Sequence, residues 1–217
     1  MIKIAPSLLA ADFCCLGNEV ESLNTTGAYM LHLDIMDGIF VPNISFGYDV
    51  VKQLRPRSQL IFDVHLMITD PMKYIDKFIE AGADSITFHY EAVENAEEVL
   101  DYIRSKGVAA AMSIKPKTSV EEIAHLLPKM DMFLIMSVEP GFGGQKYMPQ
   151  ATEKIAKAKQ YITENGLKTL IQVDGGVNAS NIARVYGAGA DIAVAGTAVF
   201  GKADRALAVK ELVDTAE

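Results

Sequence analysis

The stretches MLHLDIMDG, residues 30–38, and QLIFDVH, residues 59–65, decide the fold of this chain. Each is a short run rich in apolar and β-branched residues, which is typical of a buried strand. A helix-like segment beginning near Tyr48 separates them. Two parallel strands need such a crossover, because their ends lie at opposite edges of the sheet. The region from 30 to 65 therefore predicts one strand–helix–strand unit.

The same alternation continues along the whole chain. The predicted strands are residues 3–5, 30–34, 59–65, 85–89, 109–114, 132–138, 169–173 and 192–195. Helix-like segments begin near Leu16, Tyr48, Met72, Asn95, Val120, Pro149, Ala179 and Ala203. Eight units in 217 residues average about 27 residues each, enough for a strand, a helix and two short loops. We predict an α/β fold, a single (β/α)8 TIM barrel over residues 1–217, rather than an open doubly wound sheet of unusual width.

Charge and cysteine content exclude several classes of protein. The chain carries 20 Lys and Arg against 28 Asp and Glu, a net charge of −8, which offers no basic surface to nucleic acid or to an anionic membrane. Cys14 and Cys15 are adjacent, so a disulfide between them would be strained, and a reducing compartment is expected. The first residues fit neither a signal peptide nor a membrane span. We expect a cytoplasmic protein.

Histidines and aspartates gather at the ends of predicted strands. Residues two apart share a face of a strand, so His32 points with Asp34, and His65 points with Met67. Asp174 follows another apolar strand, and barrel active sites lie at the C-terminal ends of strands. Any one of these residues alone fits a buried polar group satisfied by hydrogen bonds. Together, two histidines and two carboxylates predict one divalent ion: zinc, iron(II), manganese or cobalt.

Three further polar residues compete for roles at the barrel mouth. Asp63 shares the inward face with His65, one layer deeper, and we expect it to orient a ligand rather than to bind the ion. His89 ends a strand and could line the pocket. Lys115 also ends a strand and supports a rival hypothesis, a Schiff-base nucleophile. No cationic neighbour is evident to lower its pKa, so a solvated or ion-paired lysine is favoured.

Glycine-rich segments follow three consecutive strands. They are residues 139–145, the pair Gly175 and Gly176, and Gly196 with Thr197. Phosphate in barrels is commonly held by backbone N–H groups of the loops after the last strands, where glycine allows a close approach. Each motif alone also fits an ordinary turn. Their clustering predicts a phosphate site. Met36, Met67 and Met136 lie at or just past strand ends, where they either fill the core or form an apolar floor for the ligand.

Five segments, taken together, resemble the ribulose-phosphate 3-epimerase family. They are residues 5–13, 32–43, 63–67, 138–145 and 173–177, in the family's order and spread over nearly the whole chain. The resemblance implies a ribulose-phosphate-binding barrel that interconverts D-ribulose 5-phosphate and D-xylulose 5-phosphate. It implies metal binding by His32, Asp34, His65 and Asp174, with Asp34 and Asp174 as acid and base. It implies substrate contacts from Ser7, His65, Gly141, Phe142, Gly143, Gly144, Asp174, Gly175, Gly176, Gly196 and Thr197.

Epimerisation at C3 fits these residues. A proton next to the C2 carbonyl must leave from one face and return to the other, which requires two proton carriers. We expect one aspartate to start ionised and the other protonated, with one metal ion per subunit stabilising the enediolate. Tyr48, Lys115 and Thr197 depart from the residues common in the family. The changes at Tyr48 and Lys115 bear on selectivity, whereas Thr197 keeps its backbone N–H and a hydroxyl, so phosphate binding is expected to persist. We also expect a homo-oligomer.

Three alternative functions also fit parts of this pattern. One is a 3-epimerase for a longer ketose phosphate such as D-allulose 6-phosphate. Another is a phosphosugar lyase of the same barrel type, although the Asp-x-Lys-x-x-Asp motif of related decarboxylases is absent. The last is a sugar-phosphate binder without turnover, against which two opposed carboxylates argue.

Overall fold

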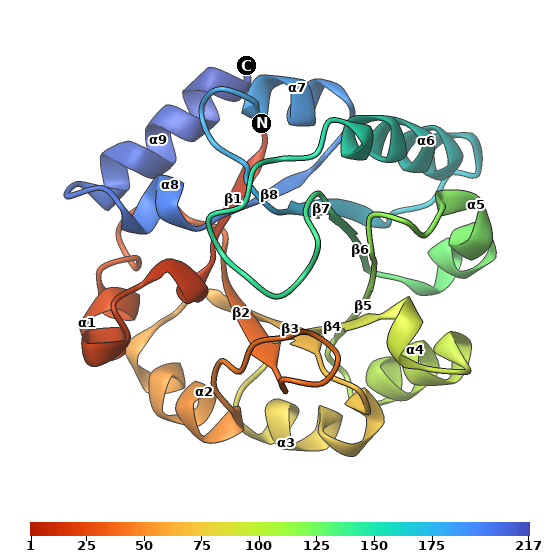
Figure 1. The fold of residues 1–217 in the computed structure, drawn as a ribbon, viewed down its shortest axis with the longest axis horizontal. Helices are drawn as coiled ribbons and strands as arrows, with labels where there is room; N and C mark the ends of the chain where they lie inside the picture. Colours follow the sequence, from red (N-terminus) through yellow and green to blue (C-terminus); the bar gives the residue numbers. More distant parts are fainter.

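A computed structural model describes residues 1–217 and shows eight parallel strands in a ring, with the helices outside it (Figure 1). The strands are β1 (Lys3–Pro6), β2 (Met30–Met36), β3 (Ile61–Met67), β4 (Ser85–His89), β5 (Ala109–Ile114), β6 (Met132–Met136), β7 (Leu170–Asp174) and β8 (Ile192–Ala195). Their order around the sheet is β1, β8, β7, β6, β5, β4, β3, β2. The predicted (β/α)8 barrel is confirmed.

The ring closes between β1 and β2. Ser7 and His32 form a parallel bridge there, and the amide of Tyr29 donates to the carbonyl of Ile4 at 2.9 Å. The first and last strands in sheet order therefore meet, so the alternative of an open doubly wound sheet is wrong. Closure matters for function because it brings the ends of distant strands to one mouth.

The helices follow the predicted order, with small shifts at their ends. They are α1 (Leu16–Glu21), α2 (Tyr48–Leu54), α3 (Ile75–Glu80), α4 (Ala96–Ser105), α5 (Val120–Ile123), α6 (Gln150–Glu164), α7 (Ile182–Gly187), α8 (Thr197–Phe200) and α9 (Arg205–Ala216). Sequence analysis missed α8 as a separate helix, because four residues are too short to show helical periodicity. The predicted strand 132–138 ends two residues early, where Ser137 Oγ turns to the carbonyls of Asp174 and Gly175.

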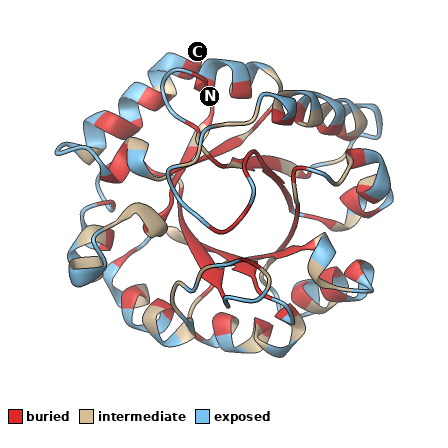
Figure 2. Ribbon diagram, in the orientation of Figure 1, coloured by how far each residue is buried: buried red, intermediate tan, exposed pale blue.

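Two layers of side chains cover the strands. Outward-facing residues such as Leu31, Leu33 and Val64 are fully buried between the sheet and the helices, whose outer faces are exposed (Figure 2). Inside the ring, an apolar floor is formed by Ala5, Met30, Ala111, Met132, Ile192 and Val194. The polar side chains of the candidate site lie above this floor, toward the C-terminal ends of the strands. None of the helices has both the length and the apolar character needed to cross a membrane.

Candidate active site

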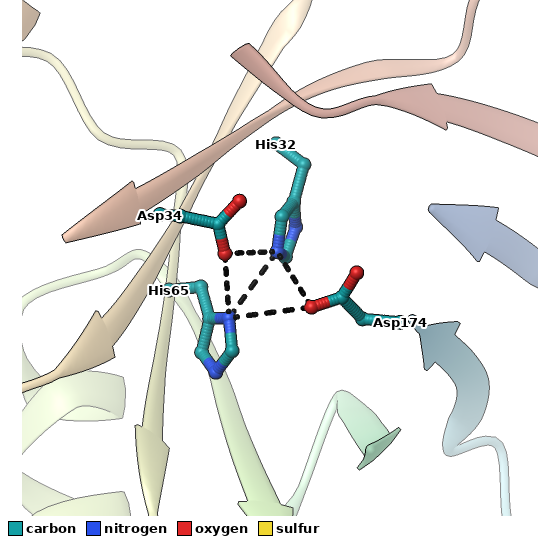
Figure 3. A group of neighbouring side chains, drawn as sticks. All are labelled: His32, Asp34, His65 and Asp174. Carbon is teal, nitrogen blue, oxygen red and sulfur yellow. Dashed lines mark hydrogen bonds and ion pairs between the residues drawn. The ribbon is translucent and has the colours of Figure 1, made fainter. Parts of the chain in front are cut away.

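Strand pairing brings the candidate ligands together. On β2, His32 and Asp34 are two residues apart and face into the barrel, and the register sets Asp34 beside His65 of β3. Asp174 ends β7 on the other side of the barrel. Figure 3 shows Asp34 and Asp174 pointing toward each other from opposite sides, with the two imidazoles between them.

The four side chains offer donor atoms to one point in space. Asp34 Oδ1 lies 3.3 Å from His32 Nε2 and 3.1 Å from His65 Nδ1, and the two nitrogens are 3.3 Å apart. Asp174 Oδ2 is 4.0 and 3.9 Å from the same two nitrogens. All four donors lie within 4.8 Å of one another. Ligands about 2.0–2.1 Å from a tetrahedral ion are about 3.3–3.4 Å apart, so the donor set fits a divalent ion.

Asp63 orients His32 from below. Its Oδ2 lies 2.8 Å from His32 Nδ1 and also accepts a hydrogen bond of 2.7 Å from Gln172 Nε2. A proton on Nδ1 of His32 leaves the lone pair of Nε2 facing Asp34 and His65. The structure thus places Asp63 behind a candidate ligand and outside the donor cluster, as the sequence analysis expected.

The other oxygen of Asp34 is held by Ser7. Ser7 Oγ donates to Asp34 Oδ2 at 2.7 Å, which leaves Oδ1 directed at the two imidazoles. Asp34 has an exposed fraction of only 3%. Ser7 therefore fixes the rotamer of a buried carboxylate as well as lining the pocket beside it.

The two carboxyl groups differ in their affinity for a proton. Burial opposes ionisation of Asp34, but the charge and hydrogen bonds of His32 and His65 outweigh it, and the pKa of Asp34 falls well below its usual value. Burial and the neighbouring charge of Asp34 raise the pKa of Asp174 to about 6. Burial opposes protonation of His32, yet the carboxylates of Asp34 and Asp63 raise its pKa well above its usual value. Near neutral pH the pair thus favours an ionised Asp34, with Asp174 poised close to titration.

A pocket of about 330 Å³ opens above the donor cluster. Nearly all the predicted site residues line it: Ser7, Asp34, Met36, Met67, Met136, Gly141, Phe142, Gly143, Gly144, Asp174, Gly175, Gly176, Gly196 and Thr197. His32 and His65 do not line it, because both are completely buried behind the carboxylates. The structure therefore places His65 among the donor atoms, and the substrate contact that the resemblance also implies for it stays a prediction.

Backbone N–H groups at the far side of the pocket are available to an anion. The amides of Gly176 and Gly196 make no backbone hydrogen bond, and both residues line the pocket. A side chain at Gly176 is excluded by its φ of +64° and by the backbone around it, since an added Cβ would lie 2.5 Å from Gln145 O and from Tyr147 N. Glycine here allows the loops after β6 and β7 to touch.

Sequence analysis missed the residues that tie the mouth loops together. The loop after β6 crosses the mouth of the barrel (Figure 1), and Asn43 Nδ2 donates to the carbonyl of Gly141 within it at 2.9 Å. Asp37 Oδ2 accepts from the amide and hydroxyl of Thr69, at 2.8 and 2.9 Å. The turn-forming pair Asp37–Gly38 was a local signal for a tight loop, but its partner on the next loop could not be read from sequence.

Lys115 and Tyr48 lie outside the pocket. Lys115 Nζ is 3.8 Å from the centre of the Phe40 ring, in a cation–π contact, which argues against its role as a Schiff-base nucleophile. Tyr48 packs edge-on against Phe78, with ring centres 6.0 Å apart. Neither departure from the family pattern therefore contacts the pocket where a substrate would bind.

His89 lies deeper than the sequence suggested. It is completely buried and does not line the pocket, and its Nε2 is 2.9 Å from His65 Nε2. Burial lowers the pKa of His89 to about 4. The third histidine of the barrel interior thus belongs to the support of the donor cluster.

The fold and the site together define a TIM-barrel protein with a candidate metal centre below a glycine-lined pocket. The family model described as "Ribulose-phosphate 3 epimerase family" matches residues 3–200. The chain is 45% identical to a ribulose-phosphate 3-epimerase of Bacillus subtilis (strain 168), covering 98% of each chain, and 45% identical to one of Eremothecium gossypii, covering 94% of this chain and 90% of the other. The chain belongs to the ribulose-phosphate 3-epimerase family.

Solved structures show the same architecture at much lower sequence identity. A tryptophan synthase complex from Pyrococcus furiosus contains a chain that matches with a TM-score of 0.70 at 17% identity, covering 99% of this chain and all of that one. Orotidine 5'-phosphate decarboxylase from Pyrococcus horikoshii matches with a TM-score of 0.66 at 15% identity, covering 100% and 99%. At these identities the likeness concerns the barrel alone.

Proposed function

We propose that this protein interconverts D-ribulose 5-phosphate and D-xylulose 5-phosphate by moving a proton at C3. The observation that carries the proposal is the pair of carboxylates, Asp34 and Asp174, which face each other across the donor cluster at the base of the pocket. Inversion at a carbon needs a proton carrier on each face of it. Strands β2 and β7 supply one carrier each, from opposite sides of the barrel.

The two carboxyl groups begin the reaction in different states. Asp34 is held ionised by its imidazole neighbours and its oxygen is aimed by Ser7, so it can accept the C3 proton. Asp174, with its pKa raised to about 6, keeps a protonated fraction near neutral pH, and this protonated form can carry the proton that is returned to the opposite face. In the reverse direction the two exchange roles. Two carboxyl groups whose surroundings shift their pKa values in opposite directions are suited to act as the base and the acid of one reaction.

One divalent ion per subunit belongs to the proposal. His32, Asp34, His65 and Asp174 would hold it, and their donor set suits zinc, iron(II), manganese or cobalt. Such an ion supplies positive charge that stabilises negative charge developing on the oxygens of the substrate. This addition is needed because an ordinary aspartate, with a pKa of about 3.9, is a weak base for a carbon acid.

The phosphate would lie against the glycine loops. Free amides at Gly176 and Gly196 can donate to its oxygens, and Thr197 adds a hydroxyl at the same wall. Met36, Met67 and Met136 line the wall nearer the carboxylates and present polarizable sulfur to the reacting part of the sugar. A binder without turnover has no use for two opposed carboxylates, and no observation favours a longer ketose phosphate such as allulose 6-phosphate.

Deuterium exchange tests the proposal. The metal-loaded protein should epimerise ribulose 5-phosphate in heavy water with deuterium appearing at C3, and a chelator should abolish both events. Asp34→Asn and Asp174→Asn should each lower epimerisation by at least about 10³-fold. Each variant keeps one carboxylate, so residual exchange should be confined to one epimer, and to the opposite epimer in the two variants.

The matched control is Asp49→Asn, an exposed carboxyl at the start of α2 that should leave turnover unchanged. Absence of C3 exchange by the metal-loaded wild type would refute the proposal. Full epimerisation by both aspartate variants would refute the two-carboxylate scheme alone.

Assembly and location complete the proposal. We place the protein in the cytoplasm as a homo-oligomer that acts on a phosphorylated ketopentose and binds neither nucleic acid nor membranes. The adjacent free cysteines support the cytoplasmic location, and the net charge of −8 supports the absence of nucleic-acid and membrane binding. Light scattering coupled to size-exclusion chromatography measures the subunit number directly.

A further inference from the structure

We infer that His89, backed by Glu91, is a positioning residue that fixes which nitrogen of His65 faces the donor cluster. This inference rests on the proposed metal-assisted function, because it concerns how the protein presents His65 to the ion. The observation behind it is a chain of buried groups behind His65, on the side away from Asp34. None of these groups lines the pocket.

Contacts within the barrel define the chain. His65 Nδ1 belongs to the donor cluster, 3.1 Å from Asp34 Oδ1 and 3.3 Å from His32 Nε2. Its other nitrogen, Nε2, lies 2.9 Å from His89 Nε2. The two rings stack with centres 5.0 Å apart and an interplanar angle of 28°. Both imidazoles are completely buried, so no solvent competes for these positions.

The direction of the hydrogen bond follows from the chemistry of a ligand. A histidine binds a divalent ion through the lone pair of a neutral imidazole, so a ligating Nδ1 requires the proton on Nε2. That N–H must then donate to His89 Nε2, which has to be the acceptor. His89 in turn carries its proton on Nδ1. One hydrogen bond between two imidazoles therefore sets the tautomer of both.

Glu91 favours that tautomer of His89. His89 Nδ1 makes no well-directed hydrogen bond, but it lies 3.4 Å from Glu91 Oε2, so a proton on Nδ1 is attracted by the carboxylate. Glu91 Oε1 accepts from the amide of Lys115 at 2.8 Å and from the hydroxyl of Thr118 at 2.5 Å. Burial opposes ionisation of Glu91, but these bonds and the contact with His89 lower its pKa to about 2. The chain thus ends on a fixed negative charge.

Phe40 packs against His89. The two ring centres are 4.9 Å apart, and Lys115 Nζ lies 3.8 Å from the centre of the Phe40 ring. Lys115 therefore contributes its amide to Glu91 and its ammonium to Phe40. This accounts for a residue at a strand end that the proposed chemistry does not use.

Each of the two candidate imidazole ligands is then oriented by a carboxylate, one directly and the other through a second imidazole. Asp63 contacts His32 directly at 2.8 Å, whereas Glu91 acts on His65 through His89. Loss of such a partner typically costs 10- to 100-fold in metal affinity. A similar cost is expected for removing the acceptor at position 89.

A pair of substitutions separates hydrogen bonding from packing. His89→Gln keeps an acceptor, since an amide oxygen reaches about the place of Nε2, whereas His89→Met has a similar length without a strong acceptor. Cobalt(II) binding to the metal-free protein is followed by visible absorption, without substrate. We expect affinity to fall 10- to 100-fold in His89→Met and to stay within about threefold of wild type in His89→Gln. Glu91→Gln should give a smaller loss.

A second readout reports the tautomer itself. Long-range ¹H–¹⁵N NMR of the zinc-loaded wild type should show His65 protonated at Nε2 and His89 at Nδ1. Thermal unfolding of the metal-free variants checks that both fold. Wild-type cobalt affinity in a folded His89→Met variant, or His65 protonated at Nδ1, would overturn the inference.

These outcomes are distinct from failure of the proposed function. If wild-type protein bound no metal or exchanged no proton at C3, the proposed function would fall first. If wild type binds metal and epimerises, while His89→Met binds metal equally well, only the inference on His89 is wrong.

Discussion

Metal affinity should fall steeply with acid, and the structure gives the size of the fall. Lowering the pH from 7 to 5 makes protons compete for two of the four candidate ligands. Burial and the charge of Asp34 raise the pKa of Asp174 to about 6, and the carboxylates around His32 raise its pKa well above the usual value. A ligand must lose its proton before it binds, so affinity is lost as pH decreases.

The titration of Asp174 sets the minimum size of this loss. Asp174, with a pKa of about 6, changes from mostly ionised at pH 7 to mostly protonated at pH 5, which costs about tenfold in affinity. Burial opposes protonation of His32, but the carboxylates of Asp34 and Asp63 raise its pKa, which adds a further loss in the same direction. The total loss is therefore more than about tenfold, or more than about 1.4 kcal/mol of binding free energy.

Calorimetric titration with zinc or cobalt at pH 5, 6 and 7 measures this slope. Repeating the titration at pH 6 in buffers of different ionisation enthalpy should show that protons are released on binding. Asp174→Asn is the matched control: binding should be weaker throughout, and its loss between pH 7 and 5 should be about tenfold smaller than in wild type. A loss below tenfold in wild type, or no proton release, would refute the electrostatic reasoning.

Three further predictions concern single residues. Asp174→Asn should raise the free energy of unfolding of the metal-free protein at pH 8 by up to about 3 kcal/mol, measured by denaturant unfolding. The reason is that the raised pKa of Asp174 makes its ionised form destabilise the folded protein above about pH 6. The gain should vanish below about pH 4, where the carboxyl group is protonated in both the folded and the unfolded protein. Gly176→Ala should lower the free energy of unfolding by about 2 kcal/mol or more, because the added Cβ would lie 2.5 Å from backbone atoms. The control is Gly107→Ala, where φ is also positive (+80°) but no atom lies within 4 Å, and it should cost about 1 kcal/mol. Ser7→Ala frees Asp34 Oδ2 and should lower kcat by about 10-fold or more in steady-state kinetics, with unchanged secondary structure by circular dichroism.

The net charge of −8 is compatible with an anionic substrate because of where the charges lie. Asp34 and Asp174 belong to the donor cluster, where a divalent ion would offset them. At the other end of the pocket, recognition would depend on backbone amides at Gly176 and Gly196, which a count of lysines and arginines does not record. The overall charge therefore argues against nucleic acid and says little about a small phosphorylated ligand.

Much of the site was predictable because its rules are local. The two-residue period of a strand put His32 with Asp34 on one face, and runs of glycine after three consecutive strands indicated close backbone approach. The eight alternating units determined the barrel. These features follow from stereochemistry within a few residues, so they can be predicted from the sequence without knowing which distant residues each segment contacts.

Other features depended on the closure of the barrel. The contact of Gln172 with Asp63 joins residues 109 apart, and the pair of imidazoles at His65 and His89 joins neighbouring strands through their register. The tertiary structure alone decided that His65 lies behind the pocket wall and that Lys115 Nζ lies against the Phe40 ring. Strand tilt and stagger set which side chains meet across a barrel interior, and these are properties of the whole ring rather than of any one segment.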